Sequence, residues 1–165
     1  MLNPLSEVFR YNRWANERLL AACRSLPEEA LDASVAGTYG SIRQTLTHLV
    51  GGQQTFVLRT HGRQHEGELS ASAPWPGWDA LCGIARQSSE DLIAIADALV
   101  AGEEVVLPWA GTDYRFPRVF FLVHALEHSV EHRTQVVVTI AQLGLPAPDL
   151  DGWAYALDSG YGQPA

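Results

Sequence analysis

Four long segments of the chain repeat apolar residues at the spacing of an α-helix. Along the first of them an i, i+3, i+4 stripe runs nearly from end to end, and Asn3 followed by Pro4 is a typical helix start. Segments of this length, separated by loops with glycine and proline, predict an all-α fold that packs as a helical bundle. They run from about Pro4 to Arg24, from Ser41 to about Thr60, from about Gly77 to Ala101, and from near Pro117 to about Leu143.

Short polar motifs mark where some of these helices begin. Ser41 and Gln44 form a capping-box pattern at the start of the second segment, and Ser25 with Glu28 predicts a capped helical turn after the first. The glycine pair 51–52 costs about 1 kcal/mol per residue in helix propensity. We therefore expect that pair to allow a close approach of another helix.

The last third of the chain is less uniform. Segments 105–109 and 114–116 flank a turn-like stretch, 110–113, and predict a small hairpin or irregular excursion before the last long helix. That last helix is apolar almost all round, which favours a place at the centre of the bundle as its most buried element. Trp153 and Tyr155 in the tail are expected to pack over one end of the bundle.

Composition narrows the class of protein. The 165 residues fit one domain, 1–165, and a net charge of −8 without any basic stripe argues against a nucleic-acid partner. Two scattered cysteines favour a reducing compartment, and neither a signal-peptide pattern nor a long apolar run is present. These features predict a cytoplasmic protein with no membrane partner.

Three histidines follow one another at four-residue intervals in the fourth segment, at His124, His128 and His132. Residues four apart stack on one face of a helix, about 6 Å apart along its axis. A buried imidazole needs a partner, and neutral imidazole is the commonest metal ligand near neutral pH. The histidine ridge therefore predicts a site for a divalent metal ion.

A further ligand is expected from elsewhere in the chain. His48 is the preferred candidate because it lies mid-helix beside the apolar stripe of the second segment, whereas His61 and His65 fall in a polar loop and are expected to be solvated. Three imidazoles would leave coordination positions open for water or substrate, as in catalytic zinc sites. Zinc, nickel and ferrous iron all suit imidazole ligands, and the residues do not choose among them. Zinc or nickel is taken as the first choice, with iron as the alternative.

Two other metal chemistries fit the sequence poorly. A carboxylate-bridged di-iron site needs Glu-x-x-His, but Ala125 and Ser129 stand three residues before His128 and His132. The stretch from His128 to His132 matches the H-x-x-E-H string of inverted zincin proteases, yet no glutamate follows it as a third ligand. Glu127 and Glu131 are either acceptors for imidazole N–H groups or part of a solvated edge.

Several stretches, taken in order, resemble the DinB-like family, also called the DinB/YfiT-like metalloenzymes. The resemblance extends over nearly the whole chain. It rests on residues 11–16, on residues 40–49 with His48, on the ladder from His124 to Gln135, and on residues 148–151.

The resemblance implies a four-helix bundle of up-down-down-up topology and, frequently, a homodimer. It also implies that His48, His128 and His132 hold the metal, with His124 lining the pocket. Glu127 and Glu131, from their positions beside the histidines, are candidates for the pocket or for groups behind the ligands. The family's damage-inducible name reports expression rather than chemistry.

Function follows from the resemblance less directly. Similar families include thiol-dependent S-transferases and a mycothiol-dependent isomerase, which implies a small-molecule substrate and a low-molecular-weight thiol as co-substrate. A coordinated thiol loses its proton and becomes a nucleophile at neutral pH. The leading hypothesis is a thiol-activating transferase; the alternatives are a non-catalytic metal-binding stress-response protein and a metal-dependent hydrolase.

Overall fold

The computed structural model describes residues 3–64, 69 and 73–163, and the part it describes is mostly helical with one small sheet. The four long helices predicted from the sequence are all present. The elements, in chain order, are α1 (Pro4–Arg24), α2 (Glu28–Leu31), α3 (Ile42–Thr60), α4 (Trp78–Ala98), β1 (Glu104–Trp109), β2 (Thr112–Pro117), α5 (Arg118–Gln142) and α6 (Gly152–Asp158).

Helix starts follow the predicted capping chemistry at two places and depart from it at a third. The Asn3 side chain accepts a hydrogen bond from the backbone of Leu5, and Ser41 and Gln44 make the reciprocal capping box. The predicted box at Ser25 is wrong. Ser25 instead ends α1, where its hydroxyl donates to the carbonyl of Ala22, and α2 begins after Pro27 without a side-chain cap.

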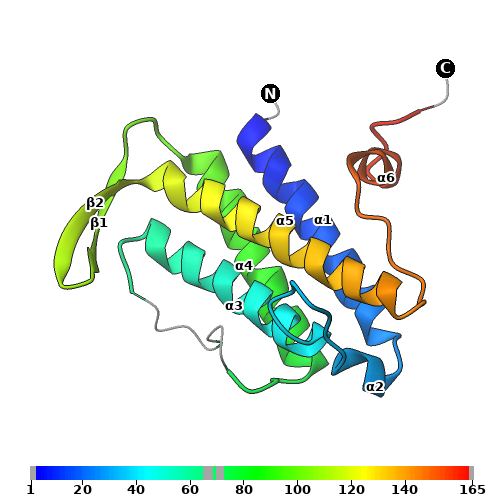
Figure 1. The fold of residues 1–165 in the computed structure, drawn as a ribbon. Coiled ribbons are helices and arrows are strands. Elements are labelled where there is room, and N and C mark those ends of the chain that lie inside the picture. Colours follow the sequence, from blue (N-terminus) through cyan, green and yellow to red (C-terminus); the bar gives the residue numbers. More distant parts are fainter. Residues whose placement is uncertain (1–2, 65–68, 70–72, 164–165) are drawn as a thin grey trace.

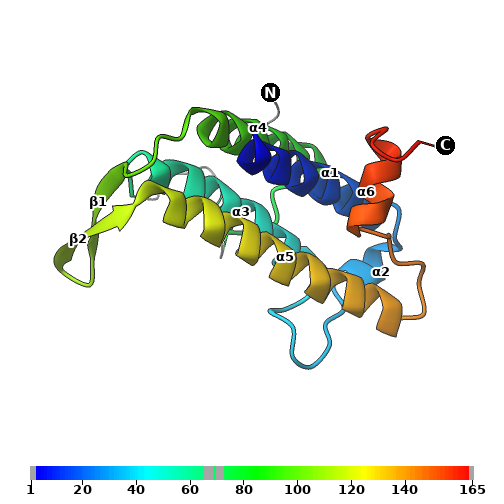
Figure 2. The same ribbon diagram turned by 90° about the horizontal axis from the view of Figure 1, so that it is seen from above.

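The long helices form two layers, which are seen edge-on in Figure 2. Helices α1 and α4 pack side by side in one layer, and α3 and α5 in the other, with α3 also contacting α4 across the interface. The two-stranded hairpin extends from one end of the molecule and α2 lies toward the other (Figure 1). Among the described residues, no helix is long and apolar enough to cross a membrane.

The helix core is divided into two apolar clusters. One lies toward the α2 end and contains Leu19, Leu46, Leu81 and Ile140, among others. The other lies toward the hairpin and includes Phe9, Phe56, Leu92, Leu107 and Leu122. Between these two clusters, every long helix contributes polar side chains to the interior. The histidines of α5 lie at the level of this polar layer.

Helix α5 is not enclosed on all sides, contrary to the prediction from its composition. Val119, Val123 and Val130 are 40%, 60% and 45% exposed, whereas Phe121, Leu122 and Ala125 are buried. A helix in a two-layer arrangement meets its neighbours on one side only, so apolar side chains on the other side face solvent. Helix α5 therefore has an apolar outer face.

The predicted hairpin is present and precedes α5 directly. Trp109 pairs with Thr112, which leaves a two-residue loop of Ala110 and Gly111 with φ values of +50° and +82°. Positive φ at both loop residues is typical of the type I′ turn that suits the twist of a hairpin.

In the tail, Tyr155 packs against α1 as expected, but Trp153 is 81% exposed.

Candidate metal centre

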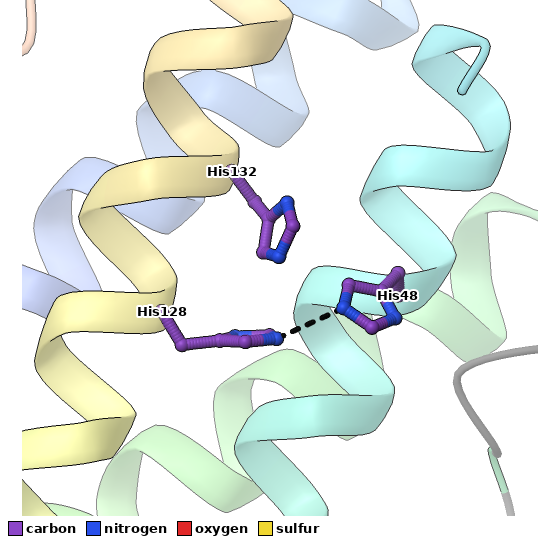
Figure 3. Close-up of side chains that lie close together, drawn as sticks. All are labelled: His48, His128 and His132. Atoms are coloured by element: carbon purple, nitrogen blue, oxygen red, sulfur yellow. Dashed lines mark hydrogen bonds between the residues drawn. The ribbon is translucent and has the colours of Figure 1, made fainter. Parts of the chain in front are cut away.

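Helices α3 and α5 bring three imidazoles together. His48 projects from α3, while His128 and His132 project from successive turns of α5 into the space between the two helices (Figure 3). One ring nitrogen of each lies within 4.8 Å of the others, an arrangement that could hold a metal ion. The structure thus assembles the three predicted ligand residues at one point.

The distances within the cluster fit a small ion. The Nε2 atoms of His48 and His128 are 3.1 Å apart. Two imidazoles that bind one tetrahedral zinc ion at about 2.0–2.1 Å have nitrogens about 3.3 Å apart. Ring centroids are 4.4 Å apart for His128 and His132 and 4.5 Å for His48 and His132.

The electrostatics of the cluster favour a neutral imidazole at His128. Burial, followed by the neighbouring histidines His132, His48 and His124, lowers the pKa of His128 from its ordinary 6.5 to about 3. His128 is therefore uncharged at neutral pH. A neutral imidazole keeps the lone pair that a metal ion requires.

Gln135 fixes the orientation of His132. Its Oε1 lies 3.0 Å from His132 Nδ1 and also accepts a hydrogen bond from the backbone N–H of Tyr39, while its Nε2 donates to Glu131. Because an amide oxygen only accepts, Nδ1 of His132 carries the proton and Nε2 faces the cluster with its lone pair. Glu131, a residue predicted to lie near the site, thus reaches His132 through Gln135.

Gly52 makes room for His128. A Cβ atom at this position of α3 would lie 2.4 Å from Cε1 and 2.9 Å from Nε2 of the His128 ring. The glycine pair was expected to allow a close approach of another helix, and at Gly52 the group that approaches is the His128 ring of α5. The absent side chain lets the imidazole lie directly against α3.

Tyr39 covers the other side of the cluster. Its ring stacks on His48 at a centroid distance of 4.0 Å and meets His132 edge-on at 5.5 Å. Sequence reasoning did not select this residue. The available signal was its position two residues before the N-cap Ser41 of the helix that carries His48.

The remaining predicted residues lie around the cluster rather than in it. The centroid of the His124 ring lies 6.5 Å from that of His128 and 4.4 Å from that of Phe56, and His124 stands at the edge of a cavity. Glu127 and His61 are exposed on the surface. His65, predicted to be solvated, lies outside the described residues.

A buried polar network lies behind the imidazoles. Arg133, which is 3% exposed, donates to the side-chain oxygens of Asn12 and Asn16, and both asparagines donate to Oε1 of Gln53. The Gln53 amide in turn donates to Ala85, Ser88 and Ser89 of α4. This network ties all four long helices together at the level of the metal centre.

Sequence reasoning did not find this network. Asn12 and Asn16 fit the apolar stripe of α1 by position, and polar residues at stripe positions on several helices were the available signal. Burial lowers the pKa of Arg133 to about 10, so the guanidinium stays charged at neutral pH.

Comparisons with known proteins agree with this picture of the fold. The family model of the DinB family matches residues 1–160. The crystal structure of a DinB-like protein from Bacillus cereus ATCC 10987 is similar, with a TM-score of 0.65 and 20% sequence identity over 88% of this chain and 94% of that chain. A search of curated proteins gave no match.

Proposed function

The chain belongs to the DinB family, and we propose that it binds one divalent metal ion through His48, His128 and His132 as the centre of a metal-dependent transferase. The observation that carries this proposal is the convergence of three imidazole nitrogens from two helices within 4.8 Å. Imidazole ligands suit zinc, nickel and iron alike. The proposal takes zinc or nickel as the ion, with iron as the alternative.

The proposed chemistry needs an open coordination position. An ion held by three imidazoles can bind a low-molecular-weight thiol or a water molecule and lower its pKa, which makes it a nucleophile at neutral pH. The protein's own residues would prepare the site: Gln135 holds His132 in the required tautomer, and Tyr39 covers the ring of His48. The acceptor is a small molecule under this proposal.

Substitution of His128 by alanine tests the ligand set. Elemental analysis of the purified variant should show loss of the stoichiometric metal, because two imidazoles make a weak site. His124→Ala is the matched control, since His124 is on the same face of α5 but outside the cluster, and it should retain metal. Full metal content in His128→Ala would refute the proposed ligands.

Turnover distinguishes the transferase from its alternatives. The metal-loaded protein is incubated with a panel of low-molecular-weight thiols and an electrophile, and the thioether product is measured. Product that requires both metal and thiol supports the transferase. Metal-dependent turnover without thiol favours a hydrolase, and no turnover with any thiol favours a non-catalytic metal-binding role.

The family resemblance extends the proposal to topology and assembly. We propose the up-down-down-up order for the four long helices, which the side-by-side pairing of α1 with α4 and of α3 with α5 supports. We also propose a homodimer. The exposed valines of α5, Val119, Val123 and Val130, give a second copy an apolar surface to cover, and light scattering of the purified protein would show a monomer if this is wrong.

A further inference from the structure

A cavity of about 730 Å³ opens beyond His124, where the hairpin meets the end of α3 and the start of α5. This volume is within the range of small-molecule sites, about 300–1,000 Å³. Its walls are mainly aromatic and come from both strands and from α5. They include Trp109, Tyr114, Phe116, Phe120 and Phe121.

The charged side chains that line this cavity are basic. Arg59 and Arg63 are the charged groups among its described lining residues. The Arg59 guanidinium is half-buried and lies 5.8 Å from the ring centroid of Phe56 and 6.0 Å from that of Trp109. Burial removes part of the hydration of this guanidinium and so lowers the pKa of Arg59.

Two nearby arginines, Arg115 and Arg118, form ion pairs, whereas Arg59 forms none with any residue that the structure describes. Arg118 contacts Glu103 at 2.9 Å, and Arg115 contacts Glu104 at 3.5 Å. Within the described residues, no carboxylate forms an ion pair with Arg59. The chain has 19 acidic and 11 basic residues, so a partly desolvated arginine with no acidic partner in the described part of the chain is unexpected.

A structural role alone accounts poorly for this placement. A basic residue in the last turn of a helix interacts favourably with the helix dipole, but an exposed side chain does so without losing hydration. Arg59 is instead positioned over aromatic faces at the wall of a cavity. An anionic ligand group would replace the hydration that its guanidinium has lost.

We propose that this cavity binds small molecules in which one anionic group, such as a carboxylate, is attached to an aromatic or bulky apolar body. The anion binds Arg59 and the body packs between the aromatic walls. His124 lines the cavity. The Phe56 ring connects it to the cluster, because its centroid lies 4.4 Å from that of His124 and 5.4 Å from that of His128. We take this ligand class to be the substrate of the imidazole centre, and in this respect the inference rests on the proposed function.

A pair of fluorescent dyes tests the role of charge. The probe 8-anilinonaphthalene-1-sulfonate carries a sulfonate on an aromatic body, and N-phenyl-1-naphthylamine has the same body without the charge. Fluorescence titration of the metal-free protein should show tighter binding of the sulfonate. Arg59→Gln should weaken sulfonate binding about ten-fold or more, the loss expected for a charge-assisted hydrogen bond, and leave the neutral dye unchanged.

Two controls localise the binding. Arg115→Gln removes a paired arginine of the same hairpin that is not part of the cavity wall, and it should change neither affinity. Trp109→Ala should weaken the binding of both dyes. Trp153→Ala, which removes an exposed tryptophan on α6, should change the binding of neither. Circular dichroism confirms that each variant is folded.

Three results would overturn the proposal: equal affinity of the wild-type protein for both dyes, unchanged sulfonate binding in Arg59→Gln, or unchanged binding of both dyes in Trp109→Ala. The titration uses metal-free protein. It therefore reports on the cavity independently of metal analysis of His128→Ala, which reports on the proposed function.

Discussion

Replacing Gly52 by alanine should separate metal binding from the stability of the helix that carries His48. The added Cβ would lie 2.4 Å from Cε1 of His128, about 1 Å short of ordinary van der Waals contact. Since α3 and α5 are packed along their length, we expect the His128 ring to rotate away. Its Nε2 would then leave the position 3.1 Å from Nε2 of His48.

The two effects of this substitution have different sizes. Metal–ligand distances tolerate deviations of only about 0.2 Å, so a displaced ring no longer coordinates. Loss of a partner that merely orients a ligand costs about 10–100-fold in metal affinity, and displacement of a ligand should cost at least as much. For folding, alanine gains about 1 kcal/mol in helix propensity. An imidazole forced off its rotamer loses about the same.

The assay measures both quantities on one preparation. Competition with a chromophoric chelator gives the metal affinity, and urea denaturation of the metal-free protein gives the free energy of unfolding. Gly83→Ala is the matched control, because Gly83 is an exposed position within α4 with nothing within 4 Å of the added Cβ. It should gain about 1 kcal/mol of stability and keep the wild-type affinity.

The reasoning fails if Gly52→Ala binds metal as tightly as the wild type, because His128 as packed here would then be no ligand. It also fails if Gly83→Ala loses metal to the same extent, since the loss would not come from the contact with His128. A fall of more than about 3 kcal/mol in stability would indicate that α3 and α5 separate instead of the ring rotating.

Two further predictions concern the interior and pH. Gln53→Leu should lower the free energy of unfolding by about 3 kcal/mol, because the buried amides of Asn12 and Asn16 lose their acceptor; urea denaturation measures this, with the exposed Gln87→Leu expected to change it by less than about 0.5 kcal/mol. The pKa of His128 is about 3 in the folded protein and 6.5 ordinarily, so as the pH falls the unfolded chain binds a proton at this residue before the folded protein does. The metal-free protein should therefore lose stability as the pH falls from 6.5 toward 3. An identical pH dependence in His128→Gln would contradict this assignment.

Local patterns were sufficient for much of the fold. The starts of α1 and α3 follow from Asn3 with Pro4 and from the Ser41–Gln44 capping box, because capping involves residues a few positions apart. The two-residue hairpin loop was less evident, since Ala110 is an uncommon residue at positive φ. The prediction that α5 is enclosed at the centre of the bundle was wrong, because apolar side chains on every face of a helix do not reveal which face meets another helix.

The sequence by itself determined that His128 and His132 lie one above the other, since the pitch of a helix fixes residues four apart. The sequence offered His48 as the third ligand and, through the family resemblance, placed His124 at the pocket, but only the tertiary structure brought nitrogens of His48, His128 and His132 within 4.8 Å of one another. That outcome depends on how α3 and α5 pack together, and Gly52, 76 positions before His128 in the chain, leaves the space that the His128 ring fills. Contacts over such separations depend on packing of whole helices, which no local pattern records.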